Sequence, residues 1–447
     1  MGKSMKRLRV SENRRFLVHE DGIPFYWLGD TAWELFHNLN REEILYYLAT
    51  RAKQGFTVVQ AVALAELDET YGKGNAYGRE PLQLAADGVP DPKRPDLKGD
   101  YSYWDHVDYT ISKANELGLY IALLPAWGNR IHRWPWEKEP EIFTVENAYV
   151  YGKWLGNRYR DVPGLVWVLG GDRPLHTRRH FEIVCAMAEG LREGDGGSHL
   201  MTFHPTGPDS SARQLHDEPW LDFNMVQSGH LHAKPTNDEL VAACYAMSPV
   251  KPVLDAEPCY EDLPIRFKAE NGYFDAVHVR RAAYYALLSG AFGHTYGHHS
   301  VWSMNDGGFV GVNPEEPFFI MGWKEALRRP GAEQMRHVKA LMQARRWLEL
   351  RPDLALLAGN LPGECRRVAA RGERFALVFC PNGLYADVVM GVLDAPFAEA
   401  SWFNTSDGAW IPAGRFPNAE GKRRFIAPAS GRDQDWILCL DAAESPE

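Results

Sequence analysis

Two carboxylates in this chain follow short apolar runs, and each stands where a buried strand is expected to end. The run LVWVLGG ends in two glycines and leads directly to Asp172, and the run KPVL leads into DAEP, which contains Glu257. Cleavage of a glycosidic bond needs such a pair, because one acid protonates the departing oxygen while the other attacks the anomeric carbon or activates water. Asp172 and Glu257 are therefore candidates for two catalytic acids.

A structural role is the alternative for each acid. Asp172 could be the N-cap of a helix that begins at Pro174. Glu257 could be a loop residue that pairs with a nearby arginine. Asp255 is one residue off the inward register, so we expect it to support the site. Asp30 follows another apolar run, and we expect it to hold sugar hydroxyls rather than to do chemistry.

The elements that must position these acids are short apolar runs separated by helical patterns. Asn40 precedes an acidic first turn, and Gly55 and Gly118 stop helices just before strands. About eight strands alternating with helices predict an α/β fold, a (β/α)8 TIM barrel. An open doubly wound sheet would need a glycine-rich fingerprint after its first strand, where this chain has GDTAW. The runs are FYWLG (25–29), FTVVQAV (56–62), LYIALLPAW (119–127), LVWVLGG (165–171), LMTFHP (200–205), FNMVQSG (223–229), KPVLDAEP (251–258) and GHTYGHH (293–299).

The pattern changes after Pro352. Runs such as RFALVFC, ADVVMGV and WILCL are short, and turn signals such as PNG and SDG separate them. This pattern is typical of a small all-β domain, a sandwich. We therefore expect a catalytic barrel over residues 1–350 and a C-terminal β-sandwich domain over residues 351–447.

Functional groups of such a barrel lie at the carboxyl ends of its strands. The polar and aromatic residues that end the runs are therefore candidates for substrate binding, and the tryptophans among them could stack on sugar faces, although each alone is as often a core residue. These candidates are Asp30, Trp33, Gln60, Trp127, His204, Gln227, His230, Tyr296, His298 and Trp302.

Composition limits the partners. The formal net charge of −10 argues against nucleic acid or an anionic membrane as the main partner. The six cysteines form no CxxC pair and no zinc spacing, so we expect no metal, no cofactor and no disulfide framework. The basic start MGKSMKRLRVSENRRF has no apolar segment, and no run reaches transmembrane length. We expect a cytoplasmic protein, or a secreted one if a signal peptide has been removed.

As a set, the motifs resemble those of the apiosidase-like glycoside hydrolases, which are (β/α)8 enzymes with a small C-terminal β domain. The resemblance implies a carbohydrate substrate, with the Asp of GGD, Asp172, as acid/base and the Glu of DAEP, Glu257, as nucleophile of a retaining mechanism. It also implies action on plant cell-wall sugars, such as apiose in pectin side chains. The motifs are FYWLGDTAWELF, GFTVVQAVAL, GLVWVLGGD, FHPTG, LDFNMVQSGH, VLDAEPCYE and GHTYGHHSVW, in that order.

The chain departs from the wider group of retaining barrel glycosidases, which usually carry Asn-Glu after the fourth strand, where this chain has Gly-Asp. Cellulase or mannanase specificity is therefore not implied. The C-terminal domain resembles one described as collagen-binding, but no residue pattern supports collagen, and we interpret it as a structural buttress.

Two other functions remain as alternatives. A catalytically silent carbohydrate-binding barrel would keep the stacking aromatics, but intact acids at both positions argue against it. A metal-dependent barrel hydrolase could use the histidines of GHTYGHH. Such barrels usually carry HxH early in the chain, where this sequence has Gly-Asp-Thr.

Overall fold

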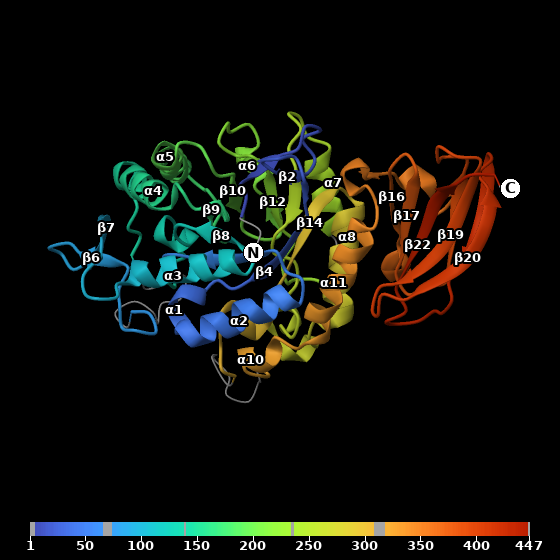
Figure 1. Ribbon diagram of the computed structural model, residues 1–447. Helices are drawn as coiled ribbons and strands as arrows, with labels where there is room; N and C mark the ends of the chain where they lie inside the picture. Colours follow the sequence, from blue (N-terminus) through green and yellow to red (C-terminus); the bar gives the residue numbers. More distant parts are fainter. Residues whose placement is uncertain (1–4, 66–73, 138–139, 234–236, 308–317, 446–447) are drawn as a thin grey trace.

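The computed structural model describes residues 5–65, 74–137, 140–233, 237–307 and 318–445. Its larger part is a nearly closed barrel of parallel strands with helices around it, which confirms the predicted (β/α)8 fold (Figure 1). The strands pair in the order β10-β9-β8-β5-β4-β14-β13-β12, and the short β11 (Asp209–Ser210) adds an antiparallel partner to β12. The barrel strands are β4 (Trp27–Thr31), β5 (Val58–Val62), β8 (Tyr120–Leu124), β9 (Leu165–Gly170), β10 (Met201–His204), β12 (Asn224–Gln227), β13 (Val253–Asp255) and β14 (Ala291–Tyr296).

The helices connect successive strands. Helix α2 begins after Asn40, whose side chain accepts the backbone N–H of Glu43 while the Glu43 carboxylate accepts the N–H of Asn40, as in a capping box. Ser102 and Asp105 start α3 in the same way. The longer helices are α2 (Arg41–Lys53), α3 (Tyr103–Glu116), α4 (Val145–Tyr159), α5 (Arg178–Asp195), α7 (Asn237–Tyr245), α8 (Ala276–Leu288) and α11 (Pro330–Gln343); α1 (Leu35–Asn38), α6 (Ala212–Leu215), α9 (His299–Trp302) and α10 (Trp323–Ala326) are single turns.

Three aromatic rings fill the barrel near the amino ends of its strands. The ring of Trp27 lies 5.9 Å from that of Phe223 and 6.2 Å from that of Phe292, in edge-to-face geometry. Each such pair contributes about 0.5–1.5 kcal/mol beyond its area burial. The indole N–H of Trp27 donates to the Thr295 hydroxyl at 3.1 Å, so no polar atom of this ring is left unpaired. Because these rings fill the amino end of the barrel, a ligand site is expected at its carboxyl end.

Smaller elements flank the barrel. An N-terminal sheet precedes it, and a hairpin follows β5. No helix of the described ranges is both long and apolar enough to cross a membrane. These elements are β1 (Leu8–Val10), β2 (Leu17–His19), β3 (Pro24–Phe25) and the hairpin β6 (Leu82–Leu84) and β7 (Pro90–Pro95).

The C-terminal part is all β, as predicted. A six-stranded sheet in the order β15-β16-β17-β22-β19-β20 packs on the two-stranded sheet β18-β21. Val378 and Leu438 of the larger sheet share one apolar core with Val388 and Phe425 of the smaller. The strands are β15 (Arg351–Pro352), β16 (Val368–Arg371), β17 (Phe375–Cys380), β18 (Tyr385–Met390), β19 (Phe397–Asn404), β20 (Trp410–Pro417), β21 (Gly421–Ile426) and β22 (Trp436–Ala443).

Helices α8 and α11 lie between the barrel sheet and this β region (Figure 1). Two adjacent arginines of α8 share one acid of the β region: Arg280 contacts Asp435 at 2.9 Å and Arg281 contacts it at 2.8 Å. The Asp435 side chain is fully buried, so this contact is shielded from water and salt. The β region is thereby fixed to the outside of the barrel.

Candidate active site

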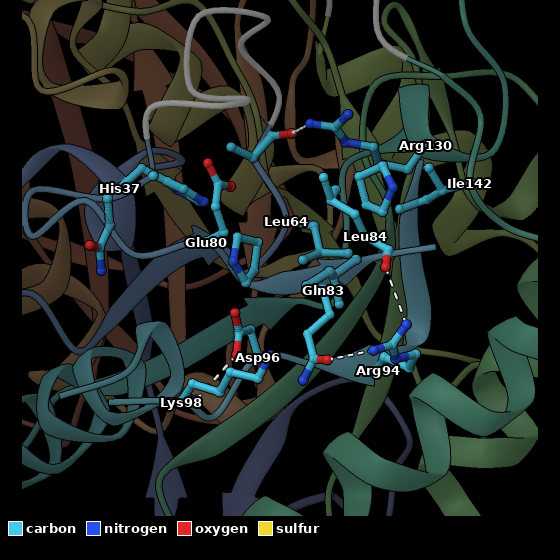
Figure 2. A pocket seen from close by; sticks show the side chains of 16 residues that line it. His37, Leu64, Glu80, Gln83, Leu84, Arg94, Asp96, Lys98, Arg130 and Ile142 are labelled. Carbon is cyan, nitrogen blue, oxygen red and sulfur yellow. Dashed lines mark hydrogen bonds between the residues drawn. The ribbon is translucent and has the colours of Figure 1, made fainter. Parts of the chain in front are cut away.

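Two pockets lie over the carboxyl ends of the barrel strands. The larger, of about 500 Å³, lies beside the β6–β7 hairpin; half of its lining residues are polar or charged, and the others include aliphatic ones such as Leu64 and Ile142 (Figure 2). Arg94 at its edge already donates to the Gln83 side chain and to the carbonyl oxygen of Leu84. Its polar groups are thus partly engaged with each other rather than directed at a ligand.

The smaller pocket, of about 290 Å³, is lined by the loops that follow β4, β8, β9, β10, β12, β13 and β14. It contains both predicted acids, Asp172 and Glu257, together with three tryptophans. Ligand sites in proteins combine apolar and aromatic walls with a few convergent polar groups, and this pocket does so at a volume near the lower end of the usual range of roughly 300–1,000 Å³. We therefore place the candidate site here, although the other pocket is larger.

The turn after β9 explains the glycines that precede Asp172. Gly170, Gly171 and Asp172 all have positive φ angles, of 89°, 114° and 52°. A Cβ on Gly170 would lie 2.4 Å from the carbonyl oxygen of His204, and one on Gly171 would lie 2.8 Å from the ring of Trp127. Side chains at either position would clash with the neighbouring strand ends. The two glycines let the chain turn sharply and bring the Asp172 carboxyl into the pocket.

Glu257 follows β13 and lies between two histidines. Nε2 of His204 is 2.8 Å from one carboxylate oxygen, and Nε2 of His230 is 3.2 Å from the other. Burial alone would favour the neutral acid, but the two imidazoles outweigh it and hold the pKa of Glu257 below its ordinary value. Glu257 is therefore kept as a carboxylate, the form that a nucleophile needs.

Asp172 has the opposite environment. Burial in the pocket raises its pKa first, and the negative charge of Glu257 raises it further, while Arg173, His204 and a hydrogen bond from Thr206 oppose the rise. The Asp172 side chain keeps 36% of its surface exposed, so a ligand atom can reach it. A carboxyl group with a raised pKa can carry a proton to a leaving group.

Several predicted substrate contacts do line this pocket. The rings of Trp33 and Trp127 lie 5.2 Å apart and form one wall. Gln227, His230 and Trp302 line it as well. His204 lies behind this surface, fully buried, with its imidazole against Glu257 and both indoles.

Four other predicted contacts lie elsewhere, and the structure gives each a partner inside the protein. Asp30 is fully buried and accepts hydrogen bonds from Arg51 Nε at 2.6 Å and the Tyr47 hydroxyl at 2.5 Å. Gln60 donates to the carbonyl oxygen of Ala256. We expected Asp30 to hold sugar hydroxyls, but its side chain lies in the barrel wall and is bound there by two side chains of α2. Neither of these residues is among the described residues that line the two pockets.

The other two of the four support the loops near the site. The Tyr296 hydroxyl donates to Glu261 at 2.6 Å. His298 contacts Asp262 at 3.0 Å and accepts the backbone N–H of Ser300, where it caps α9. Both side chains are fully buried and neither is among the described lining residues, so they hold the loop after β14 rather than face a ligand.

Asp255 supports the site, as its register predicts. It is fully buried and accepts hydrogen bonds from Asn237 and Ser228, both at close range. Burial raises the pKa of Asp255 to about 6, although the two hydrogen bonds lower it. The residue lies two positions before Glu257, and its hydrogen bonds fix the end of β13.

The histidines of GHTYGHH serve separate roles. His294 is fully buried, and burial lowers its pKa to about 3. His299 lines the pocket, and the Trp302 indole N–H donates to its Nδ1 at 3.4 Å. Within the described ranges, no group of three or more His, Cys, Asp or Glu side chains is arranged to hold a metal ion.

Sequence reasoning missed several lining residues. Tyr260 receives a hydrogen bond from the Trp33 indole at 3.2 Å and lies beside Glu257. Thr206 donates to Asp172 at 3.2 Å, and Phe267 closes another side of the pocket. All three lie on loops beyond the strand ends, where neither periodicity nor spacing marks an inward direction. The motifs VLDAEPCYE and FHPTG contained Tyr260 and Thr206 and could have suggested them.

A sequence model described as "Apiosidase-like, catalytic domain" matches residues 11–349, which include both acids and the whole barrel. This chain belongs to the apiosidase-like family. A second model, described as "Putative collagen-binding domain of a collagenase", matches residues 352–441 of the apiosidase-like protein, within its all-β region. No curated protein matches the chain.

Solved structures agree with this family. A glycoside hydrolase family 5 protein from Bacteroides vulgatus is 32% identical over 98% of this chain and 93% of its own, with a TM-score of 0.85. Another structure, named a glycoside hydrolase, is also 32% identical, over 98% of this chain and 97% of its own, with a TM-score of 0.85. An endo-β-1,4-mannanase from Thermotoga petrophila, 15% identical over 95% and 98% of the two chains with a TM-score of 0.51, shares the fold alone. The apiosidase-like protein is a glycoside hydrolase, and its substrate is a carbohydrate.

Proposed function

We propose that this glycoside hydrolase works by the retaining mechanism, with Glu257 as the nucleophile and Asp172 as the acid/base. The observation that carries the two roles, a proton donor and a carboxylate, is the opposite direction of their pKa shifts within one pocket. Retention rather than inversion is what the apiosidase-like family implies. Pairs of titratable groups whose surroundings separate their pKa values mark the acid and the base of a site. Membership of the apiosidase-like family supports the same pairing.

The proposed reaction has two steps. Glu257 attacks the anomeric carbon while Asp172 gives its proton to the glycosidic oxygen, so that the leaving group departs neutral. Asp172, now ionised, takes a proton from water, and the resulting hydroxide displaces Glu257 from the sugar. Each displacement inverts the anomeric carbon, so the product keeps the configuration of the substrate. Asp172 therefore has to cycle between two charge states, whereas Glu257 has to return to the carboxylate form.

We propose that a single sugar ring occupies the pocket and that it comes from a plant cell-wall glycan or oligosaccharide. The pocket volume of about 290 Å³ favours one ring over several. Trp33, Trp127 and Trp302 would stack on or enclose the ring, and Gln227 and His230 would bond to its hydroxyls. His204, Asp30, Gln60, Tyr296 and His298 would hold these contacts in place from within the wall.

We also propose that residues 1–350 are the catalytic domain and that residues 351–447 are a buttress. The buried contacts of Asp435 with Arg280 and Arg281 support a structural role for the second domain.

A screen against 4-nitrophenyl glycosides and pectic oligosaccharides tests the substrate, and proton NMR of the first-formed product tests the mechanism. The proposal expects hydrolysis with retained anomeric configuration. A product of inverted configuration would overturn the assignment of Glu257 as nucleophile. Oligosaccharide binding without any hydrolysis would instead identify a silent carbohydrate-binding barrel.

A further inference from the structure

The loop after β8 carries a pair of stacked tryptophans, of which Trp136 is exposed and Trp134 is half-buried. The indoles of Trp134 and Trp136 lie 5.5 Å apart with an angle of 14° between their planes. Trp136 is 74% exposed, more than any other tryptophan among the exposed large apolar residues of the described chain. Large apolar side chains held at the surface are informative, because water disfavours them unless a ligand or partner covers them.

This tryptophan pair is held firmly in place. The carboxylate of Glu137 forms an ion pair with Arg173, and both side chains are largely buried. The guanidinium of Arg173 lies 5.9 Å from the ring of Trp134, within the range of a cation–π contact. His132 forms a further hydrogen bond at 3.1 Å with the carbonyl oxygen of Pro174. These contacts join the β8 loop to the β9 loop and hold Trp134, on which the Trp136 indole stacks.

The scaffold leads directly to the proposed acid. Nη1 of Arg173 lies 3.6 Å from a carboxylate oxygen of Asp172 and donates to the Asp172 carbonyl oxygen at 2.8 Å. One guanidinium therefore contacts both the carboxyl of Asp172 and the face of Trp134. Since the acid protonates the glycosidic oxygen, the leaving group departs on the Asp172 side of the pocket, and Arg173 joins Asp172 to Trp134.

We propose that Trp134 and Trp136 form a platform that binds the leaving-group side of a glycan, namely the sugar units beyond the scissile bond. The inference rests on the retaining function proposed above, because that function makes Asp172 the acid. Flat indole faces suit the C–H faces of sugar rings, while the sugar hydroxyls stay in water or bond to neighbouring polar side chains. A substrate with a sugar leaving group gains this contact, and a compact aryl glycoside does not.

Kinetics of Trp136→Ala on two kinds of substrate test the platform. We expect kcat/KM for a pectic oligosaccharide to fall roughly tenfold or more, since loss of a stacking indole removes binding energy from the transition state. We expect a much smaller change for a 4-nitrophenyl glycoside with the same pocket sugar. Trp136→Phe, which keeps an aromatic face, should restore much of the loss. Trp410→Ala is the matched control, because Trp410 is 43% exposed on β20 in the C-terminal region.

A binding measurement separates this proposal from the proposed function. Saturation-transfer NMR with pectic oligosaccharides should give weaker transfer for Trp136→Ala than for wild type, whether or not either protein hydrolyses them. Equal transfer for the two proteins would overturn the platform, as would an equal loss of kcat/KM on both substrate types. If wild type hydrolyses no substrate but still gives stronger transfer than Trp136→Ala, the proposed function is rejected and the glycan-binding platform is supported.

Discussion

Nε2 of His204 lies 2.8 Å from one carboxylate oxygen of Glu257, and Nε2 of His230 lies 3.2 Å from the other. His204 ends β10, and His230 follows β12, so two separate strand ends converge on one acid. Both histidines are buried, and charge or hydrogen bonding from each favours the ionised form of Glu257. The pKa values of the two acids are therefore shifted in opposite directions by their neighbours and not because one is Asp and the other Glu.

The pH dependence of kcat/KM should reflect these neighbours. The acidic limb reports protonation of Glu257, whose pKa is lowered, so activity should persist below the ordinary Glu pKa of about 4.3. His204→Gln removes one imidazole, which raises the pKa of Glu257, and Glu257 then becomes protonated at a higher pH as the solution is acidified. The acidic limb should move to higher pH. A pH–rate profile with a 4-nitrophenyl glycoside measures this shift.

His199→Gln is a matched control for that variant. His199 is also buried and lies 2.9 Å from a carboxylate, that of Asp195, but it precedes β10 at the other end of the barrel. The His199→Gln variant should change the stability of the protein and leave the acidic limb of the pH–rate profile unchanged. If both variants shift the limb equally, or if His204→Gln shifts it to lower pH, the histidines do not set the charge of Glu257.

Replacement of each acid should give a different kinetic pattern. Asp172→Ala removes the proton donor, so substrates with poor leaving groups should suffer far more than activated aryl glycosides. Azide should partly rescue this variant and yield a glycosyl azide of retained configuration. Glu257→Ala should lose turnover of both substrate types, with azide giving the inverted product. Equal losses on all substrates without any response to azide would contradict the two roles, provided that circular dichroism shows both variants folded.

The fold could be predicted because its signals are local. Apolar runs, helix caps and the Gly-Asp turn each depend on neighbouring residues, and the barrel follows from their repetition. Asp172 and Glu257 could be predicted to lie at one end of the barrel for the same reason, since each comes two residues after a strand. The position of Asp30 could not be predicted, because its partner Arg51 lies near the C-terminal end of α2 and reaches it only when the helix packs on the barrel. Tyr260 was missed because its loop has no periodic pattern.

Asp30 should therefore matter for stability rather than for substrate binding. Asp30→Asn leaves the buried guanidinium of Arg51 without its carboxylate, and breaking a buried ion pair in this way costs about 3–5 kcal/mol. Glu182→Gln on α5 is the control, because its pair with Arg178 is exposed and such pairs contribute about 0–1 kcal/mol. Denaturant unfolding measures both. A large rise in KM for Asp30→Asn at unchanged stability would instead indicate that Asp30 contacts the substrate.

The glycine turn before Asp172 offers the sharpest test of how the acid is positioned. Gly171 has a φ of 114°, and a Cβ there would lie 2.8 Å from both the backbone nitrogen of Gly128 and the Trp127 ring. Gly171→Ala must therefore move the loop that carries the carboxyl, and a misplacement of even about 1 Å can cost on the order of 100-fold in rate. We expect a fall in kcat/KM of that order, greatest for substrates with poor leaving groups, because those depend on Asp172.

Gly196→Ala is the matched control for this substitution. Gly196 also has a positive φ, of 72°, at the end of α5, but a Cβ there meets nothing within 4 Å. This variant should lose about 1–2 kcal/mol of stability from backbone strain and keep the kcat/KM of wild type. Steady-state kinetics on an aryl glycoside and an oligosaccharide, with thermal unfolding of each variant, separate strain from positioning. If Gly171→Ala loses only as much as Gly196→Ala, then the close contact of the turn with Trp127 does not place Asp172.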